Sequence, residues 1–310
     1  MSLHRHIATI VLIASVLIAN KDCSAQQDPM YDQYMFNVLA FNPAYAGSAD
    51  VFTIMALSRH QWVGFEGAPS TQTLVAHTPL RSQALSLGLS FMTDKIGPAR
   101  RTSFHADFAY RIRVTEGSEL AFGLKGGIDL HQAELSSLTS VNADPANVDV
   151  KGQLLPNFGF GLFWHSERYY VGLSAPKLLE NELEIATSNV LTTALQERHY
   201  FLMGGYVLDL NDDLKFKPSF MLRSVAGAPL SLDVNANFLL RERIWFGAMY
   251  RIGNSFGFMG QYRINDQLSA GYAFDLTTNR LGAYNAGTHE IMLSYDMRFI
   301  QGRTISPRYF

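Results

Sequence analysis

The sequence predicts an all-β protein, a transmembrane antiparallel β-barrel of about fourteen strands that follows a cleaved signal peptide. Three observations support this prediction. Apolar and polar residues alternate with a period of two along most of the chain, the number of such segments is even, and large aromatic residues gather near their ends. Of the 310 residues, only 17% are charged, below the roughly 25% of soluble domains. The 25 basic and 27 acidic residues nearly balance, which gives no reason to expect a nucleic-acid partner.

The chain starts with a segment typical of secretory signal peptides. Residues 7–19 are uncharged and mostly apolar, and the small residues 23–25 follow shortly after, which predicts cleavage after Ala25. Acylation of Cys23, as in a lipoprotein, is the alternative, but Lys21 and Asp22 lack the small, apolar character that such a site needs. Removing residues 1–25 also removes the only cysteine. We therefore expect a sizeable core, a closed sheet or a membrane to stabilise the exported chain.

Residues 26–50 precede the first predicted strand and are too aromatic for a solvated tail. We expect this segment to fold against the lumen or the periplasmic rim of the barrel. There it either plugs the barrel or presents aromatic anchors to a partner protein. A passive plug without a partner is the alternative. The candidate partner-binding residues in this segment are Tyr31, Tyr34, Phe36 and Tyr45.

The barrel itself is predicted over residues 51–299, and residues 300–310 form a C-terminal tail. The alternation is clearest in 101–114, 231–241, 268–277 and 289–299. Bounded by Gly, Pro, Asn or Asp, fourteen strands are expected to start near Val51, Thr71, Ala84, Thr102, Leu120, Asn157, Tyr169, His199, Leu214, Leu230, Ile244, Phe256, Leu268 and Thr288.

The links between these strands differ in length in the way that outer-membrane barrels require. Tight turns are expected at 211–213, 241–243 and 265–266, and long loops at 136–155 and 177–197. A secreted β-sandwich would also alternate apolar and polar residues. The strand number and the aromatic residues near strand ends favour the barrel, in which they would form girdles at the lipid interfaces: Trp62, Tyr110, Trp164, Tyr169, Trp245, Tyr250, Tyr262 and the closing Phe299.

In a barrel, the polar faces of the strands would point into the lumen. That lumen would suit water and charge pairs across strands, and it would be a poor conduit for a hydrophobic ligand. The charged and histidine side chains expected there are Arg101, His105, Asp107, Arg111, Lys125, Asp129, Lys215, Lys217, Arg223, Asp233, Arg251, Arg263, Asp275, Glu290 and Arg298.

A second candidate for partner binding is the block 59–69, which contains Arg59, Trp62 and Phe65 followed by Gly67-Ala68-Pro69. Trp and Arg are common interface anchors, and Gly and Pro can fix a tight loop around them. The alternative is an interfacial girdle residue followed by a turn.

The search for catalytic chemistry gives no convincing site. His105 and Asp107 lie two residues apart on one strand face, yet no Ser sits in a G-x-S-x-G elbow. The sequence also lacks H-E-x-x-H, a P-loop and a cysteine site. We therefore predict no enzyme, no cofactor and no metal, with a hydrolase using His105 and Asp107 as a rival hypothesis.

Several long motifs resemble the PorP/SprF family of type IX secretion system outer-membrane proteins. The resemblance begins with QDPMYDQYMFNVLAFNPAYAGS (27–48) and RHQWVGFEGAPSTQTL (59–74). It continues with DKIGP (94–98), PNFGFGLFW (156–164), YVGLSAPKLL (170–179) and RHYFLMGGYVLDL (198–210). It ends with KFKPSFMLRSVAGAPLSLDVNANFLL (215–240) and YNAGTHEIMLSYDMRF (284–299), and the tail 300–310 runs past the last matching block.

The resemblance implies a non-enzymatic outer-membrane component of type IX secretion. Such a protein anchors or helps to export surface proteins, including an adhesin with a C-terminal sorting domain, and is linked to other secretion components and periplasmic lipoproteins. Gliding motility is an associated process. The alternative is an outer-membrane transport pore for small polar solutes, which would need an open lumen.

Overall fold

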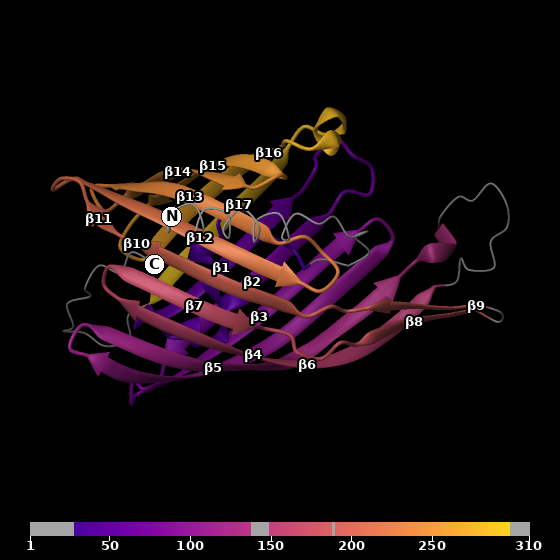
Figure 1. Cartoon of the computed structure of the whole chain (residues 1–310), viewed down its shortest axis with the longest axis horizontal. Helices are drawn as coiled ribbons and strands as arrows, with labels where there is room; N and C mark the ends of the chain where they lie inside the picture. The colour runs from indigo at the N-terminus through magenta and orange to yellow at the C-terminus, as the bar shows by residue number, and fades with distance from the viewer. Residues whose placement is uncertain (1–27, 138–148, 188–189, 298–310) are drawn as a thin grey trace, which may run out of the picture.

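A closed antiparallel β-barrel is the main body of the protein (Figure 1). The computed structural model describes residues 28–137, 149–187 and 190–297. In this part of the chain, fourteen strands form the wall, and pairing of β10 with β12 and of β1 with β17 closes the ring. Around the ring they are β1 (Phe52–His60), β2 (Ser70–Pro79), β3 (Leu85–Ile96), β4 (Ala99–Thr115), β5 (Ser118–Ala133), β6 (Val150–Ser166), β7 (Tyr169–Ala175), β10 (His199–Tyr206), β12 (Leu214–Val225), β13 (Ser231–Leu240), β14 (Ile244–Arg251), β15 (Ser255–Arg263), β16 (Leu268–Thr277) and β17 (Thr288–Met297).

The predicted strand number is confirmed, and most predicted starts lie within three residues of the observed ones. The exception is β6, which begins at Val150 rather than near Asn157. Its first residues include Gly152 with φ 75°, and its pairing with β5 shifts register between His131 and Ala133. A strand with such an irregularity loses the strict period of two. The alternation of apolar and polar residues therefore did not reveal the first residues of β6.

The long link predicted at 177–197 is not simply a loop. It contains β8 (Glu182–Thr187) and β9 (Val190–Leu195), an antiparallel hairpin that forms a second sheet and extends beyond the barrel (Figure 1). Of the other predicted loop, 136–155, residues 138–148 lie outside the described residues, and residues 150–155 belong to β6 rather than to a loop. The two-residue strand β11 (Leu208–Asp209) follows β10 and also pairs with β12. Short 3-10 helices occur at η3 (Leu135–Ser137) and η4 (Arg280–Tyr284).

The two rims of the barrel carry different links. Because neighbouring strands are antiparallel, successive links lie on alternate rims. We call the rim with links 80–84, 116–117, 167–168, 207–213, 241–243 and 264–267 the turn side; it also carries the start of β1 and the end of β17. The opposite rim, the loop side, carries the long links β1–β2 (61–69), β5–β6, β7–β10 and β16–β17 (278–287), together with the shorter links 97–98, 226–230 and 252–254. In outer-membrane barrels the short turns are periplasmic and the longer loops extracellular.

The wall alternates between an apolar outer face and a largely polar inner face. On β4, Ser103, His105 and Asp107 are buried, whereas Phe104 and Phe108 are 51% and 41% exposed. Large apolar side chains are exposed in the same way on most of the wall strands, as on β5, where Leu124 is 62% exposed. In the described part of the chain, none of the helices is long and apolar enough to cross a membrane. The outward band therefore belongs to the strands, as expected of a barrel in lipid.

Two side-chain predictions were wrong. Trp245 was expected in an outer aromatic girdle, yet it is only 8% exposed and lies inside the barrel, because its neighbours Ile244 and Phe246 take the outward positions. Arg263 was expected in the lumen but is exposed at the last position of β15, where the wall ends. The residues of four further predictions lie outside the described part of the chain: the signal peptide 1–25, Arg298, Phe299 and the tail 300–310.

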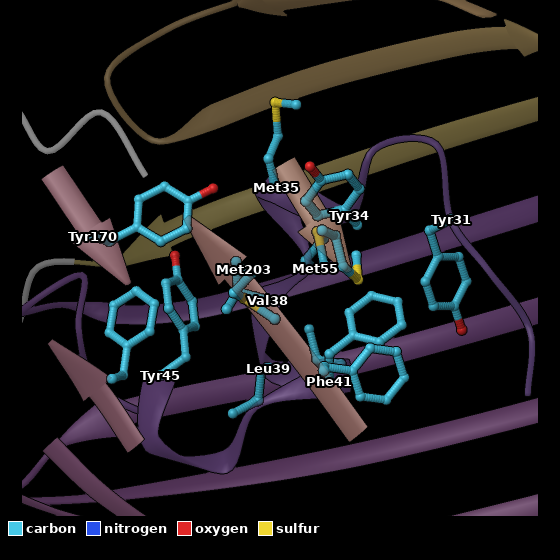
Figure 2. Close-up of a cluster of buried hydrophobic side chains, with 14 of the residues drawn as sticks. Tyr31, Tyr34, Met35, Val38, Leu39, Phe41, Tyr45, Met55, Tyr170 and Met203 are labelled. Atoms are coloured by element: carbon cyan, nitrogen blue, oxygen red, sulfur yellow. The ribbon is translucent and has the colours of Figure 1, made fainter. Parts of the chain in front are cut away.

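The interior is filled by residues 28–50, which we call the lumen segment. It forms η1 (Tyr34–Phe36), α2 (Val38–Phe41) and η2 (Pro43–Tyr45). Asn42 ends α2 and starts η2: its side chain accepts a hydrogen bond from Ala44 N at 3.0 Å, and Pro43 is preorganised for the first helical position. Figure 2 shows the buried cluster that this segment forms with wall residues such as Met55, Tyr170 and Met203.

Candidate functional site

The lumen segment crosses the barrel from the loop side to the turn side. Its first residues contact wall residues that lie near the loop-side ends of their strands, among them Arg59, Arg101 and Arg251. Its last residues contact His77 and Arg111, which lie near the turn side. The chain therefore runs through the full depth of the lumen before β1 begins at the turn side.

At the loop side, a buried ion-pair network holds Asp32. Arg59 Nη1 lies 2.5 Å from Asp32 Oδ2 and 3.1 Å from Glu290 Oε2, and Arg59 Nη2 lies 3.0 Å from Asp275 Oδ2. Glu290 also accepts hydrogen bonds from the backbone N–H groups of Asp32 and Gln33, at 3.0 and 2.9 Å. These groups are at most 3% exposed at their side chains, so removing Arg59 would leave Asp275 and Glu290 in the interior without their cation.

Asp28 forms a second attachment at the same end. Its Oδ1 lies 2.5 Å from Arg101 Nη1 and 3.3 Å from Lys177 Nζ. Burial alone would raise the pKa of the Asp28 carboxyl, but Lys177 and Arg101 outweigh that effect and hold this pKa well below its usual range. Asp28 is therefore an anion at neutral pH, and two cations fix it to β4 and to the link that follows β7.

In the middle of the lumen the contacts are mostly apolar. Phe41 packs against Phe201 with ring centroids 5.2 Å apart, and Tyr45 packs edge-on against Phe163 at 5.5 Å. Polar contacts fix the orientation: Tyr31 Oη lies 2.6 Å from Thr73 Oγ1. Burial of this many large side chains makes the segment part of the core rather than a mobile filling.

Glycines in the wall make room for the segment, most clearly on β5 and β6. A Cβ added at Gly123 on β5 would collide with the backbone of Pro43 and Ala44, and one at Gly161 on β6 would collide with the side chain of Asn42. Because Gly161 has no side chain, Asn42 fits against β6, and its Nδ2 donates to Leu162 O at 2.9 Å. The small inward face of β6 was visible in the sequence as Gly159 and Gly161, but its occupant was not.

At the turn side, Arg111 holds the end of the segment, and a cluster of aromatic rings that includes Phe36 of η1 surrounds Lys217. Arg111 Nη2 donates to Gly47 O at 2.9 Å, and Arg111 Nη1 lies 2.9 Å from Asp50 Oδ1. Lys217 Nζ lies between three rings, 5.4 Å from the centroid of Trp245, 5.6 Å from that of Tyr170 and 6.0 Å from that of Phe36. These distances are those of cation–π contacts.

The lumen charges pair partly across strands, as expected, and partly with the lumen segment. Lys125 pairs with its cross-strand neighbour Asp107 at 2.9 Å, and Arg251 with Asp233 at 2.9 Å. Arg59, Arg101 and Arg111 reach the lumen segment instead. A cavity of about 70 Å³ remains beside the segment, between Asp28, Tyr31, Phe41, His105, Lys177 and Phe201.

The geometry does not assemble a hydrolytic dyad from His105 and Asp107. Asp107 is held by Lys125, and Ser90 Oγ donates to it at 3.4 Å. His105 Nε2 faces Asp129 Oδ1 at 3.6 Å. Among the described residues, no group of three or more His, Cys, Asp or Glu side chains is arranged to hold a metal ion.

The candidate partner-binding residues fall into two groups. Tyr31, Tyr34 and Tyr45 are 2%, 0% and 7% exposed inside the barrel, and Phe36 is partly buried there. Arg59 is buried in the ion-pair network, whereas Trp62 is half-buried and Phe65 is 48% exposed in the β1–β2 link. Partner binding by these residues stays a prediction; in this arrangement only Trp62 and Phe65 are near a surface.

The sequence reasoning missed that the β1–β2 and β16–β17 links are joined. Val63 N donates to Gly287 O at 2.9 Å, and Ala286 N donates to Val63 O at 2.8 Å. Apolar side chains are exposed on both links, with Val63 at 39%, Leu281 at 38% and Tyr284 at 72%. Figure 1 shows the link that contains η4 rising from β16 beyond the rim. The two links form what we call the loop pair.

A closed barrel with an outward apolar band and a filled lumen is an outer-membrane protein. A family model described as type IX secretion system membrane protein PorP/SprF matches residues 23–295, and the chain belongs to this family. The family and fold are those of a secretion-system membrane barrel and not of an enzyme class.

The chain is similar to several solved structures at low sequence identity. CymD, a monoaromatic hydrocarbon channel, is 11% identical with a TM-score of 0.52, covering 88% of this chain and 94% of CymD. A Pseudomonas aeruginosa FadL homologue is 12% identical with a TM-score of 0.49, covering 89% and 96%. The Acinetobacter baumannii outer membrane protein Omp33 is 10% identical with a TM-score of 0.44, covering 81% and 100%. No curated protein matches the chain.

Proposed function

We propose that the protein is an anchoring component of type IX secretion that holds surface proteins at the outer membrane and does not conduct solutes through its lumen. The partners are other secretion components and periplasmic lipoproteins on the turn side. On the loop side, the partner is a surface adhesin with a C-terminal sorting domain.

The filled lumen is the observation that supports this proposal. The lumen segment is tied to the wall by ion pairs at the loop side, by apolar packing in the middle and by Arg111 at the turn side. A pore for small polar solutes would need this segment to leave, and leaving would break buried charge pairs that cost several kcal/mol each, roughly 3–5.

The loop pair supports the location of the outer partner. Exposed aromatic and aliphatic side chains on a structured loop are typical of interface anchors. Phe65 and Tyr284 are 48% and 72% exposed on this loop pair, and backbone hydrogen bonds between the two links preorganise it.

The test is affinity purification of the tagged protein from mildly solubilised outer membranes, with mass spectrometry of the bound proteins. We expect a large surface protein with a C-terminal sorting domain together with periplasmic components. The Phe65→Ser/Tyr284→Ser variant should lose the surface protein and keep the periplasmic components. Leu230→Ser is the matched control, because Leu230 is 44% exposed on another loop-side link.

Equal recovery of the surface protein with Phe65→Ser/Tyr284→Ser would contradict the location of the anchor. Single-channel recordings test the other half of the proposal. Steady conductance of the wild-type barrel in planar bilayers, at the level of a variant lacking residues 28–48, would instead support the transport pore.

A further inference from the structure

The outward face of the wall carries a row of polar side chains at the loop side, where the apolar band ends. The row runs across six neighbouring strands, and each member is the direct cross-strand partner of the next. In order from β17 through β1, β2, β3 and β4 to β5, the members are His289, His60, Ser70, Lys95, Arg100 and Gln132. Directly paired residues share one face of a sheet. That face is the outer one here, because the adjacent Arg59, Thr71 and Asp94 are buried in the interior.

The two basic members of this row form an unbalanced pair. Lys95 and Arg100 are direct cross-strand partners and both are exposed. Like charges directly opposite each other destabilise a sheet. In the described part of the chain neither of them forms a salt bridge, although the acidic Glu134 stands two positions beyond Gln132 on the chain. An anion placed between the ammonium and the guanidinium groups would relieve the repulsion through charge-assisted hydrogen bonds.

An apolar groove opens on the same outer face, nearer the middle of the band. Its volume is about 400 Å³, and it lies over β17, β1, β2 and β3. The groove exists because Ala56 is small and stands between its two cross-strand partners, Leu74 and Leu293. Since this face borders hydrocarbon, the groove has the position and the lining that suit a lipid acyl chain.

A chain of hydrogen-bonding side chains joins the groove to the polar row. Gln72 Nε2 donates to Ser70 Oγ at 2.9 Å, and Ser70 Oγ lies 3.3 Å from His60 Nδ1. His60 Nε2 lies 3.2 Å from Ser58 Oγ, and both Gln72 and Ser58 line the groove. Polar groups thus accompany the groove up to Ser70, the cross-strand partner of Lys95, as the glycerol or sugar part of a lipid would require.

We propose that this face is a binding site for a phosphorylated lipid of the outer leaflet, with a phosphate group between Lys95 and Arg100 and an acyl chain in the groove beside Ala56. The proposal rests on the outer-membrane barrel and its loop side, and it is independent of the anchoring function.

The experiment uses the full-length barrel purified in detergent and native mass spectrometry with two probes: a bis-phosphorylated glycolipid and its dephosphorylated counterpart. We expect the phosphorylated form to bind about tenfold more tightly, the ratio that corresponds to about 1.4 kcal/mol. Lys95→Gln/Arg100→Gln should abolish this difference. Arg243→Gln/Arg263→Gln is the matched control, because both residues are exposed at the turn side and the net charge changes equally.

The groove is tested separately with Ala56→Phe, which fills it. This variant should weaken binding of both lipids while the preference for phosphate stays. Equal binding of the two lipids by the wild type would overturn the proposal. The proposal would also be overturned if the control variant lost the preference for the phosphorylated lipid as fully as Lys95→Gln/Arg100→Gln does. Inorganic phosphate that competes as well as the lipid would show an ion site and also overturn it. If Lys95→Gln/Arg100→Gln does not insert, the single variant Lys95→Gln carries the same test.

Discussion

Arg59 is the residue on which the loop-side network depends. It lies on β1, yet its guanidinium serves three carboxylates from three parts of the chain: Asp32 in the lumen segment, Asp275 on β16 and Glu290 on β17. The planar fork of an Arg can contact several acceptors at once, which a Lys ammonium does with less directional control. One side chain on β1 therefore joins the lumen segment to the last two strands of the wall, across the seam between β1 and β17.

Arg59→Ala should be strongly destabilising, by about 3–5 kcal/mol, because it leaves buried carboxylates without a cation. Arg59→Lys should lower the free energy of unfolding by less than Arg59→Ala does. Urea unfolding of the barrel in lipid vesicles measures the difference. The double variant Arg59→Ala/Asp32→Asn should recover part of the loss; if it is no more stable than Arg59→Ala, the pair does not act as the geometry indicates.

Asp28 gives a pH-dependent prediction. Its folded-state pKa is lowered, so its charge stabilises the docked segment above the unfolded pKa of about 3.9, and the contribution is lost as the pH falls toward the folded value. Asp28→Asn should lower the free energy of unfolding by about 2 kcal/mol at neutral pH, because charge-assisted contacts are lost. The difference in unfolding temperature between wild type and variant should shrink below about pH 4. A constant difference over this range would contradict the assignment.

At the scale of the element, the lumen segment and the wall are fitted to each other. The segment has only short helices, α2 and two 3-10 turns, which would not be stable alone in water. Its stability comes from burial against the wall, and at Gly123 and Gly161 the absence of a wall side chain leaves the space that the segment occupies.

Gly123→Val should push η2 out of place, because the new side chain would occupy the positions of Pro43 and Ala44. Gly126→Val is a matched control on the same strand, since a Cβ there meets no atom within 4 Å. We expect ion conductance in planar bilayers and faster hydrogen exchange at residues 42–46 with Gly123→Val, and neither change with Gly126→Val. Unchanged exchange in Gly123→Val would show that the segment does not pack there.

At the scale of the whole molecule, the loop side should face outward. Ala68→Cys lies in the β1–β2 link and Ser82→Cys in the β2–β3 link on the opposite rim. The sequence has one cysteine, Cys23, in the predicted signal peptide. A membrane-impermeant maleimide added to intact cells should label Ala68→Cys and not Ser82→Cys, and both variants should be labelled after lysis. The reverse labelling pattern would show that the turn side, and not the loop side, faces outward.

The barrel could be predicted from the sequence because its signal is local. Alternation within 101–114 or 231–241 needs no knowledge of the rest of the chain, and strand starts at His199, Leu214, Ile244, Leu268 and Thr288 were exact. Trp245 was misplaced because residue type was given more weight than its alternation with Ile244 and Phe246. The aromatic excess of residues 26–50 indicated burial, but not a path through the lumen. That path depends on contacts such as Asp32 with Glu290, which are 258 residues apart.

The direction of the lumen segment also constrains how the protein is assembled. The segment is continuous with β1, and β1 pairs with β17, the last strand of the wall to leave the ribosome. Asp32, Arg59 and Glu290 meet only when that pairing forms. Closure of the ring and completion of the loop-side network are therefore the same step, with the slow kinetics expected of contacts between distant ends of a chain.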